Sequence, residues 1–153
     1  MTIQLIESRD LTQLVPLLRD AEEGDDRITR TIEDPAMTAY IARDGDKTVG
    51  AVVMHWSDES EIIYIQTNAS LRGQGYGKAI MAAIIAEARQ RARQAVTVGT
   101  SNSSWANISF YQKCGFRMDS VRRDFFNYIQ PPLYEDGIKM QDMLVLRHDL
   151  TQN

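Results

Sequence analysis

Three glycines at alternating positions are the feature of this sequence that most directly suggests chemistry. Between a β-prone run and a helical pattern stands the segment Arg72-Gly73-Gln74-Gly75-Tyr76-Gly77-Lys78. The first amides of a helix lack partners within that helix, and the helix dipole adds about half a positive charge there. Glycines let such a backbone approach a phosphate closely, and this loop is flanked by an arginine and a lysine. The segment therefore predicts a pyrophosphate site.

The spacing of these glycines excludes two common nucleotide-binding loops. A P-loop places four residues between its first glycine and its final Gly-Lys, and Ser or Thr follows. Here three residues separate Gly73 from Gly77, and Ala79 follows Lys78. The dinucleotide fingerprint G-x-G-x-x-G also fails, because the third glycine arrives one residue early. For the loop taken alone, a glycine-rich turn without a ligand remains the alternative.

A second segment strengthens the functional interpretation. From Asn107 to Phe116 the chain reads Asn-Ile-Ser-Phe-Tyr-Gln-Lys-Cys-Gly-Phe. This segment resembles, in compressed form, the signature N-x-x-A-x-x-[FY]-Y-x-k-x-GF of the GNAT superfamily of N-acetyltransferases. The glycine loop resembles motif A of the same superfamily, R/Q-x-x-G-x-G/A. The resemblance covers most of residues 38–118, and stretches between residues 125 and 143 look like a bacterial subgroup of uncharacterised GNAT proteins.

The resemblance implies a fold and a cosubstrate. The fold is an α/β (α+β) mixed sheet with largely antiparallel N-terminal strands, a central β-α-β crossover, and a fourth and fifth strand that splay apart. Acetyl-CoA is the implied cosubstrate, and its pantetheine arm would lie along the backbone of residues 63–67, opposite residues 97–100. The implied acetyl-CoA contacts are Ile65, Gln66, Thr67, Arg72, Gly73, Gln74, Gly75, Tyr76, Gly77, Lys78, Asn107 and Tyr111.

Acetyl transfer to an amine requires a base, donors for an oxyanion, and an acid. An alkylammonium group with a pKa of about 10 must lose a proton before it attacks, and a backbone N–H of residues 63–67 could stabilise the oxyanion. By resemblance, Tyr111 protonates the leaving CoA thiolate, and helix packing is its alternative role. Glu61 is the candidate base, with an exposed strand-edge carboxylate as the alternative. Asn107 binds the pantetheine or phosphate region, or else caps a helix.

The acceptor side of the site is less specific in the sequence. Trp56 and Trp105 either line an acceptor pocket or pack in the core. An acidic wall that attracts a cationic amine is one interpretation of a charge run, and a solvated turn between two helices is the other. The residues of this run are Glu22, Glu23, Asp25 and Asp26.

Two other kinds of chemistry are not expected. Cys114 is the only cysteine, so the chain forms no internal disulfide, and its position suggests a small buried hydrophobe rather than a nucleophile. His55 and His148 are far apart and have no neighbouring His or Cys ligands. We therefore expect no metal site.

Hydrophobic patterning predicts the elements that position these residues. Period-2 or β-branched runs predict strands at 3–5, 38–43, 48–56, 61–67, 95–100, 117–126 and 140–149. Helical spacing predicts a helix capped by Asp10, a second short helix after the acidic turn 22–26, and helices at 79–88 and 105–113. The segment between the last two strands is expected to be a loop.

Length and composition limit the class of protein. A chain of 153 residues that is 43% hydrophobic and 25% charged predicts a single globular domain over residues 1–153. A net charge of −4 disfavours nucleic acid as a partner, and no apolar run is long enough to span a bilayer. With no signal peptide visible, we expect a cytoplasmic protein.

The expected function is transfer of the acetyl group from acetyl-CoA to a primary amine, by direct attack in a ternary complex. The acceptor is a small molecule or a protein amine, and the resemblance leaves a homodimer possible. A non-catalytic acyl-CoA-binding sensor is the alternative, and the two differ in whether free CoA is released when an amine is supplied.

Overall fold

Strands and helices alternate along the chain much as the hydrophobic patterns predict. The computed structural model describes residues 1–19 and 24–151. The strands are β1 (Ile3–Glu7), β2 (Thr38–Asp44), β3 (Lys47–His55), β4 (Glu59–Thr67), β5 (Ala95–Ser101), β6 (Arg117–Arg122), β7 (Tyr134–Glu135), β8 (Ile138–Lys139) and β9 (Met143–Asp149). The α-helices are α1 (Leu11–Leu18), α2 (Asp25–Glu33), α3 (Tyr76–Gln90) and α4 (Trp105–Lys113). Two 3₁₀ turns are η1 (Ala69–Leu71) and η2 (Phe125–Tyr128).

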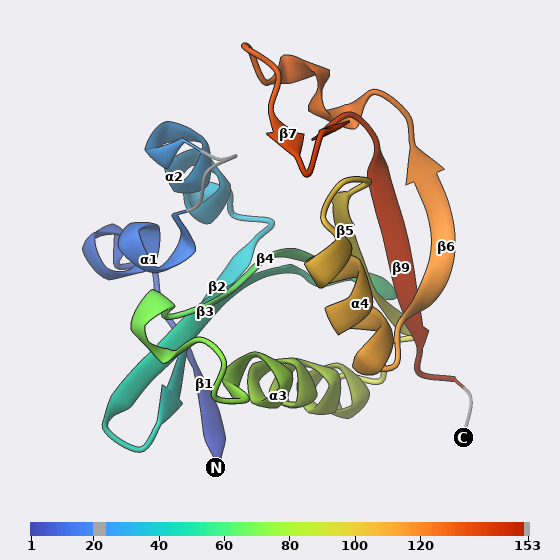
Figure 1. Ribbon diagram of the computed structural model, residues 1–153. Helices are drawn as coiled ribbons and strands as arrows, with labels where there is room; N and C mark the ends of the chain where they lie inside the picture. Colours follow the sequence, from blue (N-terminus) through green and yellow to red (C-terminus); the bar gives the residue numbers. More distant parts are fainter. Residues whose placement is uncertain (20–23, 152–153) are drawn as a thin grey trace.

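One mixed sheet of seven strands, in the order β1-β2-β3-β4-β5-β9-β6, forms the centre of the molecule (Figure 1). Helices α3 and α4 pack on one face, where Ile80 and Ile84 of α3 are fully buried. Helices α1 and α2 pack on the other face through Leu14, Leu18 and Ile28. Each such side chain contributes about 1.5–3 kcal/mol through removal of its apolar surface from water. The mixed α/β fold and the parallel β4-α3-β5 crossover are therefore confirmed.

The first two helices begin where local chemistry favours them. Asp10 caps α1 and accepts a hydrogen bond from the Thr12 amide at 3.1 Å, as the sequence predicts. The prediction that Asp25 and Asp26 lie in a turn is wrong, because both occupy the first turn of α2. Carboxylates are stabilised there by the positive end of the helix dipole, and Asp25 also pairs with Arg19 at 2.8 Å.

The segment before the last strand is more structured than the sequence predicts. Strand β6 ends at Arg122 rather than at residue 126, and β9 begins at Met143 rather than at residue 140. The expected loop between them contains η2 and the β7–β8 hairpin. The side-chain oxygen of Asn102 anchors this excursion by accepting the amides of Gln141 at 3.0 Å and Asp142 at 2.9 Å.

Strands β4 and β5 separate after a short parallel pairing. Only residues 59–62 of β4 pair with residues 95–98 of β5, although both strands continue. Beyond that point β5 pairs with β9 alone, from Gly99 opposite Val145 onward. The predicted splay is thus present. The two strands part at the end of the sheet that lies toward α2 and β7 (Figure 1). Within residues 1–19 and 24–151, no helix combines the length and the apolar character needed to cross a membrane.

Candidate active site

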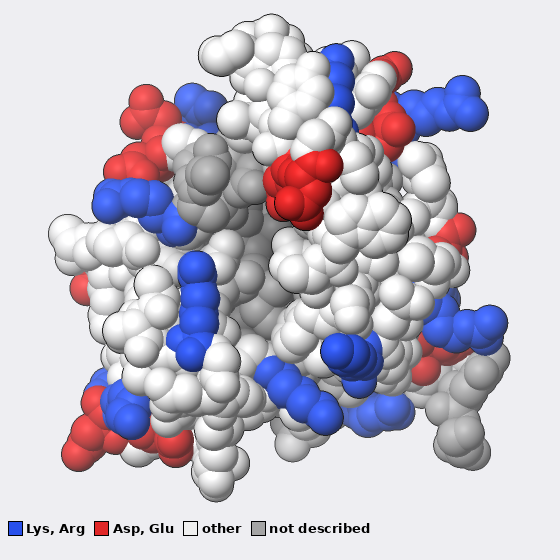
Figure 2. Space-filling model, viewed as in Figure 1, with Lys and Arg blue, Asp and Glu red and all other residues white. Residues whose placement is uncertain are grey.

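A cavity of about 640 Å³ lies at the gap between β4 and β5. Its floor is residues 61–66 of β4, and Gly99, Thr100 and Ser101 of β5 form the opposite wall. Helix α4 adds Asn107 and Tyr111. The space-filling view shows a hollow in the middle of this face, with Lys and Arg side chains along its lower rim (Figure 2).

One edge of β4 inside this cavity has no neighbouring strand. Strand β3 pairs with the other edge of β4 along its length, with Val52 opposite Ile65 and Ala51 opposite Gln66. The edge that faces β5 is paired only as far as Ile62. Backbone N–H and C=O groups in the interior need partners, so this edge suits an extended ligand that carries amide groups. Ile65 and Gln66 line the cavity, and Thr67 ends the strand beyond it.

The glycine loop stands at the N-terminus of α3, as the sequence predicts. Gly73 has φ 79° and Gly75, the residue before the helix, has φ 86°, a region that side chains disfavour. A Cβ atom on either glycine would meet no atom within 4 Å, so the space above the loop is open. Gly77 has a different role, since a Cβ there would lie 3.3 Å from the Thr67 hydroxyl and 3.4 Å from the Phe110 ring. Gly77 therefore lets α3 pack closely against β4 and α4.

The side chains of the loop point in different directions. Tyr76 is 6% exposed and its hydroxyl donates to Asp44 at 3.3 Å, so its side chain is directed into the fold and only its backbone is available at the helix start. The positive charge of Lys78 lowers the pKa of the thiol of Cys114, the residue that follows α4. Burial has the larger effect on Cys114 and raises the pKa of its thiol. Cys114 is half-buried and does not line the cavity.

Tyr111 lies in the wall of the cavity and is 7% exposed. Burial raises the pKa of its hydroxyl to about 12, above the ordinary value near 10 that the sequence alone suggests. No residue in the described ranges hydrogen-bonds to this hydroxyl. Tyr111 therefore stays protonated in ordinary buffers and is able to donate to a group bound in the cavity.

The buried hydroxyl of Tyr111 predicts a loss of stability in alkali. Below pH 10 the hydroxyl is protonated in both the folded and the unfolded chain, so its titration does not lower the free energy of unfolding. Between pH 10 and 12 the unfolded chain loses the proton and the folded chain retains it, so stability falls by about 1 kcal/mol at pH 11 and about 3 kcal/mol in all. Urea unfolding at pH 9, 10 and 11 measures this loss. The Tyr111→Phe variant has no hydroxyl to titrate, so its free energy of unfolding should fall by about 1 kcal/mol less than that of the wild type by pH 11. An equal fall in both proteins would contradict the raised pKa of Tyr111.

Asn107 lines the cavity and donates from Nδ2 to the Thr100 hydroxyl at 3.4 Å. The alternative that Asn107 caps a helix is wrong, because Ser104 is the N-cap of α4 and Asn107 lies inside the helix. The Ser104 hydroxyl instead donates to Glu135 of β7 at 2.8 Å, and the Ser103 hydroxyl donates to the same oxygen at 3.0 Å. This carboxylate at the start of α4 attaches the β7–β8 hairpin, a contact that sequence reasoning missed.

Glu61 projects into the cavity from β4, and its carboxylate lies 3.7 Å from the guanidinium of Arg122. The rest of this half of the cavity comes from elements that the sequence did not connect. Helix α2 contributes Arg27, Arg30 and Thr31, its C-cap residue Asp34 also lines the cavity, and η2 contributes Phe125 and Phe126. The helical spacing of α2 predicts the helix but not its neighbours. Because η2 lies about a hundred residues later in the chain, the sequence contained no signal that the two elements meet.

The acidic wall is not part of this cavity as far as the chain is described. Asp25 and Asp26 do not line it, and Glu22 and Glu23 lie outside the described residues. Trp105 does not line it either, since this side chain is 61% exposed on the outer side of α4. The prediction that Asp25, Asp26 and Trp105 line the acceptor pocket is therefore wrong.

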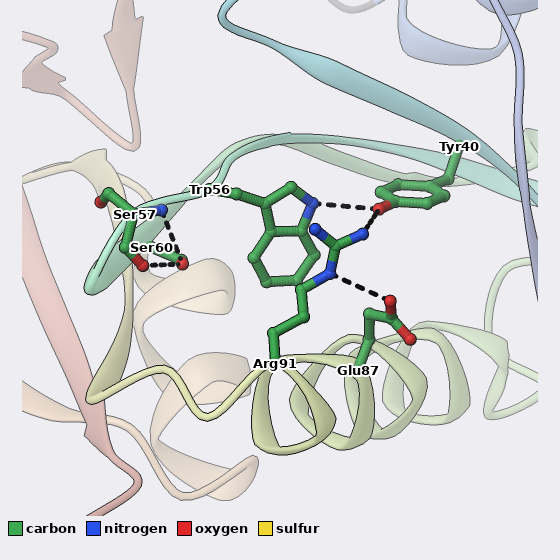
Figure 3. Close-up of polar contacts among 6 residues, drawn as sticks. All are labelled: Tyr40, Trp56, Ser57, Ser60, Glu87 and Arg91. Atoms are coloured by element: carbon green, nitrogen blue, oxygen red, sulfur yellow. Dashed lines mark hydrogen bonds and ion pairs between the residues drawn. The ribbon is translucent and has the colours of Figure 1, made fainter.

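Trp56 packs beside α3 rather than in the cavity (Figure 3). Its indole N–H donates to the Tyr40 hydroxyl at 3.0 Å, and the Arg91 guanidinium stacks 4.3 Å from its ring centroid. Arg91 also donates to the Tyr40 hydroxyl at 3.2 Å and pairs with Glu87 at 3.0 Å. This cluster ties the end of α3 to β2 and β3, so Trp56 has a structural role. Among the residues described, no group of three or more His, Cys, Asp or Glu side chains is arranged to hold a metal ion.

Comparison with known proteins identifies the family. The model of the acetyltransferase (GNAT) family matches residues 5–116. An uncharacterised N-acetyltransferase of Bacillus subtilis, YvbK, is 33% identical over 141 residues, which is 90% of each chain.

Solved structures agree with this match. A Bacillus subtilis acetyltransferase in complex with CoA is 32% identical with a TM-score of 0.85, over 97% of this chain and 98% of the other. A GNAT family acetyltransferase from Elizabethkingia anophelis with acetyl-CoA bound is 28% identical with a TM-score of 0.84, over 97% of this chain and 99% of the other. The chain belongs to the GNAT family of acetyltransferases.

Proposed function

We propose that this acetyltransferase moves the acetyl group of acetyl-CoA directly to a primary amine bound in the same cavity, and that residues 1–153 act as one domain. The observation that carries the proposal is the edge of β4 that β5 stops pairing with after Ile62, beside an open glycine loop. An extended thioester with two amide groups and a diphosphate matches both features.

The cofactor contacts follow from the direction of the strand. The pantetheine amides pair with the backbone of residues 63–67, a stretch that spans about 17 Å at the usual strand rise. The diphosphate lies on the amides of residues 72–78, where Arg72 and Lys78 add positive charge. Asn107 and Tyr111 approach the pantetheine from α4. These assignments are supported by the position of the cavity and by the open space above Gly73 and Gly75.

The reaction has three parts that these residues supply. Glu61 accepts a proton from the acceptor ammonium through water, because the carboxylate lines the cavity beside the reacting strand. The nitrogen bonds to the thioester carbon as the C–S bond breaks. The register shift opposite Val53 and Met54 leaves Ile63 as an extra residue in β4, so its backbone N–H is the proposed oxyanion donor. The CoA sulfur leaves as a thiolate that accepts a hydrogen bond from Tyr111.

Direct attack is favoured over a covalent thiol intermediate. A nucleophilic cysteine needs a lowered pKa and access to the substrate. Burial raises the pKa of Cys114, and its side chain lies outside the cavity. No acyl-cysteine is therefore proposed.

A coupled assay tests the proposal. The protein is supplied with acetyl-CoA and a panel of primary amines, and free CoA is followed with a thiol reagent. We expect CoA release that depends on the amine and one N-acetylated product per CoA. The Glu61→Gln variant should retain CoA affinity and lose about a hundredfold in turnover, because it removes the proton acceptor without changing the shape of the site.

Two results separate the alternatives. CoA binding without release for any amine would favour the acyl-CoA sensor. Full turnover by Glu61→Gln across the pH range would remove Glu61 from the mechanism and leave solvent as the base.

A further inference from the structure

The segment between β6 and β9 forms an apolar wall of the cavity. Phe125, Phe126 and Met140 line the cavity from this segment, and we call these three side chains the aromatic wall. The ring centroids of Phe125 and Phe126 lie 5.1 Å apart at an interplanar angle of 81°, and both residues are half-buried, so part of their surface is uncovered. Uncovered aromatic surface beside a cavity favours an apolar group of a ligand over water.

Sulfur-containing side chains extend the aromatic wall toward the strands. Met143, the first residue of β9, lines the cavity. Its side chain lies over Gly99 of β5, because a Cβ atom on Gly99 would clash with the Met143 sulfur. Met37 lines the same cavity from the connection between α2 and β2. Thioether side chains adapt to apolar ligands of different shapes, so the apolar lining reaches from η2 to β5.

Hydrogen bonds from Asn102 hold the end of this segment. Asn102 follows β5 directly, and its side-chain oxygen accepts the amides of Gln141 at 3.0 Å and Asp142 at 2.9 Å. Its Nδ2 donates to the carbonyl of Lys139 at 3.1 Å. The Asn102 amide also donates to the Asp142 carbonyl at 2.9 Å. One asparagine therefore fixes the chain from Lys139 to Asp142, which includes one residue of the aromatic wall.

Two further hydrogen bonds connect this stretch to η2. The Phe126 amide donates to the Gln141 carbonyl at 3.0 Å. The amide of Asp124, the residue before η2, donates to the carboxylate of Asp142 at 2.9 Å. Asn102 is therefore connected to both aromatic rings through short chains of contacts, each with one or two residues between.

The position of Asn102 also relates the aromatic wall to the cofactor side of the cavity. Asn102 lies in the turn between β5 and α4, where Ser101 and Ser104 line the cavity. The same turn leads into α4, which adds Asn107 and Tyr111 to the lining. A side chain at this turn therefore sets how far the aromatic wall stands from the strand along which the thioester is proposed to lie.

We propose that the aromatic wall binds an apolar group of the acceptor amine, and that Asn102 is the positioning residue that holds this wall in place. This inference rests on the proposed function and narrows its substrate to primary amines with an apolar group. Asn102 does not line the cavity, so it acts through the wall and not on the acceptor itself. Without its side chain two amides and a carbonyl lose their partners, and the segment would shift to pair them with water.

Two primary amines that differ by a phenyl group test the proposal. 2-Phenylethylamine and ethylamine are compared as acceptors, and we expect kcat/KM to be about tenfold to a hundredfold higher for 2-phenylethylamine. The Asn102→Ala variant should lower this ratio by about tenfold, mainly through KM for 2-phenylethylamine. Its KM for acetyl-CoA should stay within about threefold of the wild-type value, since a general loss of structure would change both constants.

Two variants serve as controls for the change at Asn102. Asn102→Asp still accepts both amides and loses only the donor to the Lys139 carbonyl, so its ratio should stay within about threefold of the wild type. Asn127→Ala makes the same change as Asn102→Ala at an exposed residue of η2 outside the cavity, and it should leave the ratio unchanged.

The Phe126→Ala variant shows whether Asn102 acts through the aromatic wall. This variant should lower the ratio by itself, and adding Asn102→Ala should lower it little further, because effects on one chain of contacts are not additive. If Asn102→Ala does not fold at the assay temperature, Asp142→Ala takes its place. It breaks the contact with the Asp124 amide, one step closer to the wall, and should lower the ratio in the same direction.

The outcomes separate this inference from the proposed function. Equal kcat/KM for the two amines, an unchanged ratio in Asn102→Ala or in the variant that replaces it, or additive effects with Phe126→Ala would overturn the inference while acetyl transfer stands. If neither amine turns over, calorimetric titration of 2-phenylethylamine into the protein–CoA complex decides. Weaker binding by Asn102→Ala supports the inference, and equal binding, or no binding by the wild type, overturns it. Failure to bind CoA would count against the proposed function, and the same titration into the protein alone then tests the wall.

Discussion

Replacing Gly75 with glutamate is expected to abolish CoA binding, with a loss of affinity of at least about a hundredfold. The glutamate side chain would stand above the start of α3, where the open loop is proposed to hold the diphosphate, and a like charge in such a site costs several kcal/mol. Because a Cβ at Gly75 meets no atom within 4 Å, the variant should fold. The positive φ of 86° adds strain of about 1–2 kcal/mol. Titration calorimetry with CoA measures the affinity.

Gly137→Glu is the matched control for this experiment. Gly137 also has a positive φ, 78°, and open space around its Cβ position, but it lies at the turn between β7 and β8. The control carries the same charge and a similar strain, so it should bind CoA as the wild type does. The uncharged Gly75→Gln variant separates bulk from charge. Unchanged affinity of Gly75→Glu would show that the diphosphate binds elsewhere.

Removing the hydroxyl of Tyr111 is expected to lower turnover by about a hundredfold and to leave CoA affinity within a few fold of the wild type. A pKa of about 12 makes complete proton transfer to a thiolate, whose thiol has a pKa of about 8.5, unfavourable. We therefore propose that the hydroxyl acts chiefly as a hydrogen-bond donor to charge that develops on sulfur in the transition state. Such a donor affects kcat more than ground-state binding.

Single-turnover kinetics with Tyr111→Phe measure the chemical step directly. The variant loses only the oxygen, and within the described residues no partner is left unsatisfied, so the fold should be intact. Tyr134→Phe makes the same change at a tyrosine that is 63% exposed and outside the cavity, and it should have wild-type kinetics. An equal rate for Tyr111→Phe and wild type would assign Tyr111 to packing alone.

Parts of the site that depend on contiguous residues were predictable. The glycine loop and the helix that follows it are adjacent in the sequence, and positive φ together with a helix start are local properties. The splayed strands followed from the family resemblance rather than from the strand pattern itself. The register confirms them, because pairing stops at Ile62 and Val98. Asp10 as the cap of α1 was predictable for the same local reason.

Other features depended on contacts between distant segments. Arg27 and Tyr128 are about a hundred residues apart in the sequence, so no local pattern predicts that their side chains stack beside the cavity. The sequence pattern did not show whether Trp56 lines an acceptor pocket or packs in the core. Its stacking on Arg91 shows that it packs.

The amino-acid sequence by itself determined the order of most strands and helices, because that order depends on short-range periodicity. Two short motifs, the glycine loop and the segment from Asn107 to Phe116, carried the resemblance to the family. Only the tertiary structure decided which charged side chains line the cavity. It placed Arg30 in the cavity and Asp25 outside it, and it buried Tyr111 enough to raise its pKa to about 12. The burial of a side chain and the charges around it depend on which distant segments pack together, and no local sequence pattern encodes those contacts.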